Sequence, residues 1–239
     1  MLGSMTRGIR SLLFPPTCAG CVRPLESPDQ EPLCTDCRNG LPAAQSPSCV
    51  RCGLSLAHQG AGITLCLACR TQPPPFDRAV SPFVYDGPAK ELILGLKYRG
   101  RLSLSRFLTE AMVDSILETI GPAAAEVVVP VPLHPTRLRE RTFNQAQILA
   151  AGVAGQLGLP CRSDLLVRVR ATEPQTGLRR EERWENLRDA FALSCEGLPA
   201  KSFLLVDDVF TTGATVRACA AALKRGGASH VFVVTAARG

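Results

Sequence analysis

The sequence predicts an α/β protein with a mostly parallel sheet and helices on both faces, preceded by a small cysteine-rich domain. Three observations predict this fold class. Eight of the eleven cysteines stand in C-x-x-C pairs between Cys18 and Cys69. Beyond residue 76, short apolar runs alternate with helix-like segments, as in a doubly wound sheet. Aromatic residues are only 5% of a chain that is 46% hydrophobic, so we expect a core of Leu, Val and Ala.

The cysteine pairs form two sets of nearly equal spacing. Twelve residues separate the pairs of the first set, and thirteen separate those of the second. Two thiolates on a tight turn bind one side of a metal ion, and two such turns complete a tetrahedron. The near-duplication therefore predicts a repeated module with two structural Zn²⁺ ions. The expected ligands are Cys18, Cys21, Cys34, Cys37, Cys49, Cys52, Cys66 and Cys69.

Two alternatives remain for these cysteines: a redox-active thiol cluster or an iron–sulfur cluster. We expect sequential pairing of the two sets, although the spacing also permits an interleaved arrangement. Metal is favoured because a segment so poor in large apolar residues needs folding energy from elsewhere, on the order of 10 kcal/mol per zinc site. We expect a cysteine-rich domain over residues 1–75, closed by a proline-rich linker, and a second domain over residues 76–239.

The net charge indicates the class of ligand, and the apolar runs of the sequence indicate the cellular compartment. The net charge of +6 includes no dense basic block, so it suits anionic ligands such as phosphates, nucleotides or single-stranded nucleic acid. The apolar run after Arg10 spans only residues 12–14, too short for the core of a signal peptide. No run approaches the ~18 apolar residues of a membrane span. Zinc sites built from thiolates imply a reducing compartment, and neither a signal peptide nor a membrane span is predicted. We therefore expect the protein in the cytoplasm.

The predicted elements after the linker follow from periodicity and from helix-breaking residues. A short strand is expected over 79–85, and residues 90–98 place Leu92, Ile93 and Leu96 on one helical face before Gly100. A second helix follows over 104–120. Continuous apolar runs predict buried strands at 127–131, 203–206 and 231–235. Helices are expected over 143–157, before Gly158, and over 215–224, before a Gly-Gly pair; short strands are possible at 165–169 and 191–193.

The segment after the run at 203–206 predicts a sugar-phosphate-binding loop. Asp207 and Asp208 follow at the carboxyl end of that strand, where open α/β sheets bind ligands. The turn Thr211-Thr212-Gly213-Ala214-Thr215 then leads into a helix. Its amides and the positive end of the helix dipole suit a phosphate, and glycine permits close approach. The alternative is a pair of capping aspartates and a structural turn rich in threonine.

These residues carry a resemblance to a known family. The stretch VDDVFTTGAT is similar to the signature of type I phosphoribosyltransferases, which bind 5-phosphoribosyl 1-diphosphate (PRPP). Read together with the cysteine pairs and the segments DGPAKELILGLKYRGR, VVPVPLHPTRLRERTFNQA and QTGLRREERWENLRDAF, nearly the whole chain resembles the ComF family of competence-associated proteins. The resemblance implies a type I phosphoribosyltransferase-like sheet after the zinc domain.

The resemblance also implies roles for individual residues. Asp207 and Asp208 would contact the ribose hydroxyls at the catalytic centre, and Thr211, Thr212, Gly213, Ala214 and Thr215 would hold the 5′-phosphate. A diphosphate loop would comprise Val131, Pro132, Leu133 and His134, with Mg²⁺ bridging PRPP. An arginine-rich hood between Val169 and Asn186 would contribute Arg179 and Arg183, unless it is a solvated hairpin. Lys97, Arg99, Arg137 and Arg141 are further phosphate contacts or merely surface residues.

Three functions remain open at this point. The first is a Mg²⁺-dependent phosphoribosyltransferase of unknown acceptor, although the sequence contains no distinct base-recognition motif and no clear general base. The second is handling of single-stranded DNA during natural transformation, together with the DNA-uptake machinery; aromatic residues for base stacking are few. The third is a sensor of PRPP or nucleotides that binds without catalysis.

Overall fold

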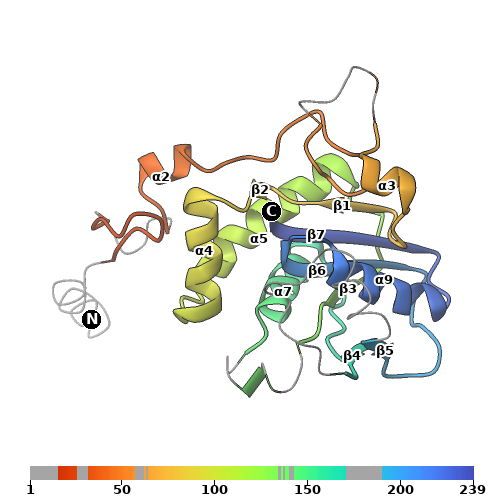
Figure 1. The fold of residues 1–239 in the computed structure, drawn as a ribbon. Helices are drawn as coiled ribbons and strands as arrows, with labels where there is room; N and C mark the ends of the chain where they lie inside the picture. The colour runs from red at the N-terminus through yellow and green to blue at the C-terminus, as the bar shows by residue number, and fades with distance from the viewer. Residues whose placement is uncertain are drawn as a thin grey trace.

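A computed structural model describes residues 16–25, 32–56, 62, 64–133, 136, 138–139, 143–170 and 190–239. Its centre is a five-stranded parallel sheet in the order β1-β7-β6-β3, with β2 also paired to β7 (Figure 1). A separate antiparallel pair consists of β4 and β5. The strands are β1 (Arg78–Val80), β2 (Phe83–Val84), β3 (Val127–Pro130), β4 (Leu166–Arg168), β5 (Phe191–Leu193), β6 (Ser202–Phe210) and β7 (His230–Arg238).

Helices cover both faces of the sheet, which confirms the predicted fold class. Residues of α4, α5 and α7 form one buried cluster with Leu204 and Val206 of β6. Residues of α9 and of the β4–β5 pair form the other with Phe203 and Leu205. Successive strand residues point to opposite faces, so an unbroken apolar run serves both cores. The helices are α4 (Gly87–Tyr98), α5 (Leu104–Thr119), α7 (Gln145–Leu157) and α9 (Ala214–Arg225).

Several strand boundaries differ from the sequence-based expectation, and β7 extends three residues beyond the expected end at 235. The strand expected over 79–85 is two strands, β1 and β2, because Pro82 has no amide hydrogen for the ladder between them. The strand expected to end at Val206 continues to Phe210, because β7 pairs with it as far as Phe210 opposite Arg238. Asp207 and Asp208 therefore lie within β6 rather than after it.

The cysteine-rich region contacts the sheet directly. Its two short helices are α2 (Thr35–Asn39) and α3 (Leu67–Thr71). The amide of Ala79 in β1 donates to the carbonyl of Arg51 at 2.8 Å, and the four cysteines from Cys49 to Cys69 belong to the same buried cluster as Phe203 and Leu205. The second half of this region is therefore part of a shared core. The division of the chain at residue 75 stays a prediction.

Within the described ranges, no helix combines the length and the apolar character that crossing a membrane requires.

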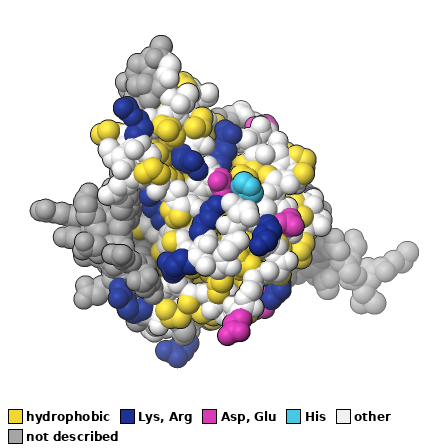
Figure 2. Space-filling view, turned by 90° about the vertical axis from the view of Figure 1, so that its right-hand side faces the viewer, with side chains coloured by type: hydrophobic (Ala, Val, Ile, Leu, Met, Phe, Trp, Pro, Cys, Tyr) yellow, Lys and Arg dark blue, Asp and Glu magenta, His cyan; other side chains and the backbone are white. Residues whose placement is uncertain are grey.

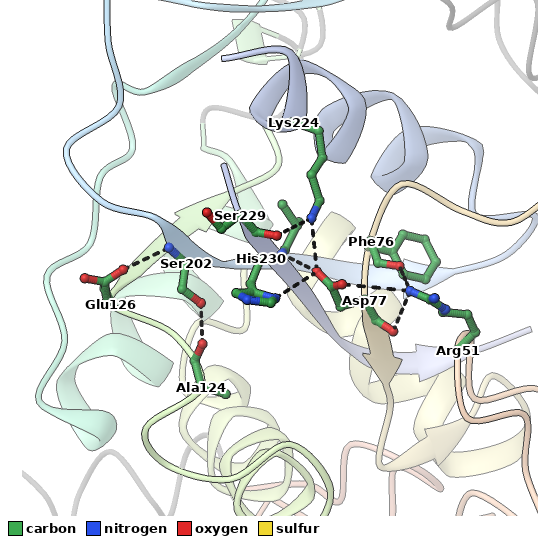
Figure 3. A network of polar contacts seen from close by, with 10 residues as sticks. Arg51, Phe76, Asp77, Ala124, Glu126, Ser202, Lys224, Ser229 and His230 are labelled. Atoms are coloured by element: carbon green, nitrogen blue, oxygen red, sulfur yellow. Dashed lines mark hydrogen bonds and ion pairs between the residues drawn. The ribbon is translucent and has the colours of Figure 1, made fainter. Parts of the chain in front are cut away.

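Polar contacts fix the amino-terminal ends of the strands (Figure 3). Asp77 Oδ2 accepts hydrogen bonds from the amide of Val231 at 2.8 Å and from Lys224 Nζ at 3.3 Å. Glu126 Oε2 accepts from the amides of Lys201 and Ser202 at 3.0 and 2.9 Å. Each carboxylate satisfies backbone donors that a strand end would otherwise expose, so the pair sets where β6 and β7 begin.

Asp77 should contribute stability that depends on pH. Burial opposes its ionisation, but the Val231 amide and Lys224 outweigh burial and hold the pKa of Asp77 below its ordinary 3.8. The contribution is therefore present above the unfolded-state pKa and is lost as pH falls through the lower folded-state pKa. At neutral pH we expect Asp77→Ala to lower the free energy of unfolding by about 1–3 kcal/mol. Denaturant unfolding measures this, with Asp114→Asn on the exposed face of α5 as control.

The comparison with Asp77→Asn tests the charge itself. This variant keeps an oxygen acceptor for the Val231 amide, so it should be destabilised less than Asp77→Ala at neutral pH. Its difference from the wild type should shrink as pH falls below about 4, because the unfolded-state carboxylate takes up a proton there and the folded-state carboxylate does so only at lower pH. A difference that stayed constant from pH 7 to pH 3 would contradict this account.

Candidate functional site

The parallel register brings two predicted loops to one edge of the sheet. β3 pairs with β6 with Pro130 opposite Val206, and the amide of Val131 donates to the carbonyl of Val206 at 2.9 Å. Residues 131–133 therefore emerge beside Asp207 and Asp208. Asn144, the N-cap of α7, donates from Nδ2 to the carbonyl of Val131 at 3.0 Å and accepts from the amide of Ala146. This double contact fixes the chain after β3 to the start of α7.

The two aspartates point to opposite faces of the sheet. Lys97 Nζ of α4 lies 2.8 Å from Asp208 Oδ1, and the two side chains are only 15% and 13% exposed. Asp207 acts on the other face. Burial raises the pKa of the Cys219 thiol in α9, the charge of Asp207 raises it further, and Arg168 of β4 opposes the rise. Asp207 Oδ1 also accepts from the amide of Asp208 at 2.8 Å. The site thus presents two carboxylates in different electrostatic surroundings.

Lys97 is held in its charged form despite burial. Burial disfavours the ammonium group, but Asp208 outweighs it, so the pKa of Lys97 is raised above its ordinary 10.5. Tyr85 stands close to the same pair: burial raises the pKa of its phenol, Lys97 lowers it and Asp208 raises it. A positive charge, a carboxylate and a hydroxyl therefore lie together on the α4 side of the site, a combination suited to sugar hydroxyls and phosphate oxygens.

The turn after β6 places a glycine with a left-handed backbone directly before α9. Gly213 has φ +75°, and a Cβ on it would lie 2.5 Å from Phe210 Cζ, so a side chain there would strain the backbone and displace the Phe210 ring. Thr212 Oγ1 accepts from the amide of Ala214 at 3.4 Å, and α9 begins at that residue. The first amides of an α-helix have no intrahelical partner and carry the positive end of the dipole. Thr211, Thr212 and Thr215 add hydroxyls that are exposed or half-buried.

The remaining predicted phosphate contacts divide into two groups. Arg99, which directly follows α4, pairs with Glu91 at 2.9 Å, and both side chains are partly exposed. The others lie outside the described residues: His134, Arg137, Arg141, Arg179 and Arg183. The ends of the expected hood are nevertheless held together, because Arg168 pairs with Phe191 and the amide of Val169 donates to the carbonyl of Ala190 at 2.9 Å.

Three residues that the structure brings into contact with the site were not predicted from the sequence. Tyr85 had no distinguishing signal in the sequence. Asn144 could have been found, since asparagine before a periodic apolar segment is a typical helix N-cap. Arg238 is the basic residue that ends a mostly apolar strand, and its position opposite Phe210 depends on the β6–β7 register.

The eight paired cysteines gather in two sets of four, which we name the first cluster (Cys18, Cys21, Cys34, Cys37) and the second cluster (Cys49, Cys52, Cys66, Cys69). The pairing is sequential, as expected. Within each set the sulfur atoms lie within 4.8 Å of one another. The Cys21–Cys34 and Cys52–Cys66 sulfur distances are both 3.7 Å. A tetrahedral zinc with Zn–S bonds of about 2.3 Å separates its sulfurs by about 3.8 Å, so both clusters fit zinc.

The two clusters differ in their surroundings. In the first, three cysteines are exposed or half-buried, and the Arg23 guanidinium lowers the pKa of the Cys21 thiol to about 6. All four cysteines of the second are buried. Burial raises the pKa of Cys52 to about 11, although Arg238 opposes the rise. Zinc binds cysteines as thiolates. The buried second cluster therefore depends more than the first on its metal ion to stabilise the negative charge of those thiolates.

Comparison with known proteins finds a family match to the cysteine-rich region and relatives that align with most of the chain. Residues 9–70 match the double zinc ribbon domain family. The chain is 34% identical to DNA utilization protein YhgH of Salmonella typhimurium, over 93% of this chain and 96% of that protein. It is 30% identical to competence protein F of Haemophilus influenzae, over 86% and 90%. Competence protein ComFC of Bacillus subtilis is 31% identical over 66% and 63%.

Among solved structures, TT1426 from Thermus thermophilus aligns with 54% of this chain and 72% of that chain. Its sequence identity is 20% and its TM-score is 0.33, so this likeness has no bearing on function.

The purified protein should hold two zinc ions per chain, one in each cluster. We expect Cys21→Ser and Cys52→Ser each to reduce the zinc content to about one ion, since three thiolates bind zinc far more weakly than four. Cys52→Ser should lower the thermal midpoint more, because its cluster is part of the sheet core. Elemental analysis and thermal unfolding measure these effects. Cys195→Ser, at an exposed cysteine outside both clusters, is the control; equal destabilisation by both cluster variants would refute the distinction.

Proposed function

The chain is a member of the ComF family of competence-associated proteins, and we propose that its sheet edge binds PRPP or a related ribose 5-phosphate ligand. The observation that carries this proposal is the convergence of an acidic pair and a glycine-containing anion cradle at the end of one strand. Asp207 and Asp208 lie near the carboxyl end of β6, and the turn at residues 211–215 enters α9 directly afterwards. A ribose with a 5′-phosphate presents hydroxyls on one side and an anion on the other.

Three groups of residues would each contact a different part of the ligand. The turn suits the 5′-phosphate, because its amides and hydroxyls can donate to an anion and Gly213 permits close approach. The carboxylates of Asp207 and Asp208 suit the ribose hydroxyls as hydrogen-bond acceptors. Residues 131–133, held by Asn144 beside the acidic pair, suit the diphosphate. This assignment uses neighbouring loops of one sheet edge, as the topology of open α/β proteins favours.

Magnesium is proposed as a companion of the ligand. The carboxylate oxygens of Asp207 and Asp208 are of the kind that Mg²⁺ prefers, but Lys97 already faces Asp208 Oδ1 at 2.8 Å. We therefore assign most ligands of the ion to diphosphate oxygens and water rather than to the protein. When bound, Mg²⁺ would offset the charge of a departing diphosphate.

Asparagine substitutions test the binding site. Asp207→Asn and Asp208→Asn each replace a charged acceptor by an amide, so we expect each to weaken PRPP binding by about tenfold or more. Isothermal calorimetry in the presence of Mg²⁺ measures the affinity, and zinc content verifies the fold. The matched control is Asp114→Asn, at an exposed aspartate on α5. Unchanged affinity in both site variants would exclude the acidic pair as the ribose contact.

Binding and transfer are separate questions. A phosphoribosyltransferase would release diphosphate from PRPP when an acceptor is present, whereas a sensor would bind PRPP without turnover. Incubation with PRPP, Mg²⁺ and a panel of nucleobases distinguishes them, with the Asp207→Asn/Asp208→Asn double variant as background. Release above this background would establish transfer. Calorimetric binding without release would favour the sensor.

Handling of single-stranded DNA is a second candidate, supported by the names of the relatives. They are named for DNA utilization and for competence. Figure 2 shows Lys and Arg side chains spread over one face of the molecule, with acidic side chains among them. Near the amino ends of the strands, the exposed cationic residues include Lys201 and Arg225. Dispersed cations of this kind suit a flexible phosphate backbone more than a rigid duplex.

Salt dependence tests this second candidate. If the basic face binds single strands through phosphates, affinity for an oligothymidine should fall about tenfold or more between about 50 and 200 mM salt. Lys201→Ala/Arg225→Ala should weaken binding and flatten the salt slope. Arg106→Ala is the control, because Arg106 pairs with Glu110 on the exposed surface of α5. Fluorescence anisotropy measures both quantities; a slope near zero would rule out backbone contacts as the source of affinity.

A further inference from the structure

Arg238 lies between the second cluster and the turn of the proposed ligand site. It is the last residue of β7, and its Nη1 donates to the carbonyl oxygen of Cys52. Its Nη2 lies 3.6 Å from Cys52 Sγ, and its Nε is buried. A guanidinium in this position needs a negative partner, since burying an unpaired charge is strongly unfavourable. The thiolates of the second cluster supply that partner.

Zinc binding determines how strong this partner is. Four thiolates around one Zn²⁺ leave an excess of two negative charges, which the adjacent guanidinium partly neutralises. When zinc leaves, nothing holds the four sulfurs at tetrahedral spacing, and Cys52, whose carbonyl and sulfur both contact the guanidinium, loses its fixed position. The metal and Arg238 therefore depend on each other.

The opposite side of Arg238 contacts the turn. The guanidinium carbon lies 4.3 Å from the centroid of the Phe210 ring. That ring packs edge-on against Phe76 at 6.1 Å and fills the space where a Cβ of Gly213 would stand. Phe210 is also fixed through its backbone, since its carbonyl accepts from the amide of Gly239 at 2.9 Å. An unbroken series of contacts thus runs from Cys52 through Arg238 and Phe210 to Gly213.

We propose that Arg238 is a positioning residue through which zinc in the second cluster holds the turn at residues 211–215 in its binding shape. With zinc bound, the guanidinium is drawn against Cys52 and supports Phe210, and Phe210 supports the left-handed Gly213. Without zinc this support is lost. The consequence for ligand affinity rests on the proposed function; the consequence for the shape of the turn does not.

The first cluster offers a matched control. Arg23 contacts Cys21 Sγ at 3.3 Å and Cys34 Sγ at 3.7 Å, so each cluster has an arginine at its sulfurs. Arg23, however, stands two residues from Cys21, is exposed, and pairs with Asp36 at 2.6 Å. These contacts all stay within the first cluster and its short helix α2. Arg238→Met and Arg23→Met each remove a positive charge beside a zinc cluster, but only Arg238→Met also removes the support for the turn. Comparing the two variants therefore separates these effects.

The test uses the zinc-loaded full chain and two measurements. Amide hydrogen exchange of residues 211–216 reports the shape of the turn without any ligand, and calorimetry with PRPP and Mg²⁺ reports affinity. For Arg238→Met we expect exchange at the turn to quicken by about tenfold and PRPP affinity to fall by a similar factor, the scale of a buried cation–aromatic contact. Arg23→Met should leave both unchanged while speeding zinc release to a chromogenic chelator.

A second variant keeps the test decisive if Arg238→Met does not fold. Phe210→Leu retains Arg238 and its cluster but removes the ring between them and the turn. We expect normal zinc retention with faster exchange at residues 211–216. Exchange at the turn that is unchanged in Phe210→Leu, or equal in Arg238→Met and Arg23→Met, would overturn the proposal. Altered exchange in a protein that never binds PRPP would instead uphold the coupling and refute the proposed function.

Discussion

The parallel pairing of β6 between β3 and β7 is the constraint on which the rest of the structure depends. The pairing runs from Ser202 opposite His230 to Phe210 opposite Arg238, and β3 adds its own register on the other side. Buried amides and carbonyls must be paired, so these registers tolerate no slip. They carry the chain after β3, the acidic pair and Arg238 to one edge. Backbone hydrogen bonding between the strands therefore places the residues of the candidate ligand site at one edge of the sheet.

The same geometry gives neighbouring residues different chemistry. Asp207 and Asp208 are adjacent in sequence, yet strand alternation turns them toward different helices. Asp208 meets Lys97 from α4, whereas Asp207 acts on the α9 side with Arg168 within electrostatic range of the same thiol. Two carboxylates on one face would repel each other. Because they point to different faces, the two side chains offer hydrogen-bond acceptors in two directions.

The cysteine region contributes to the fold unequally. The first cluster stands mostly at the periphery, with Cys18 alone fully buried among its four ligands. The second is enclosed in the core that includes Phe76, Phe203 and α9. A short segment with few large apolar residues cannot bury a core by itself, so its metal and its contact with the sheet stabilise one another. This explains how a zinc module is connected, through Arg238 and Phe210, to a turn more than a hundred residues away in the sequence.

The sequence by itself determined the fold class, the eight zinc ligands and the position of the candidate phosphate turn, because each of these depends on local spacing. Apolar runs, C-x-x-C pairs and a glycine before a helix are visible within about a dozen residues. Only the tertiary structure decided that β6 continues through Asp207 and Asp208, that Lys97 rather than Arg99 contacts the acidic pair, and that Arg238 joins the second cluster to Phe210. These contacts join segments far apart in the chain, and strand register, which local composition does not encode, brings them together.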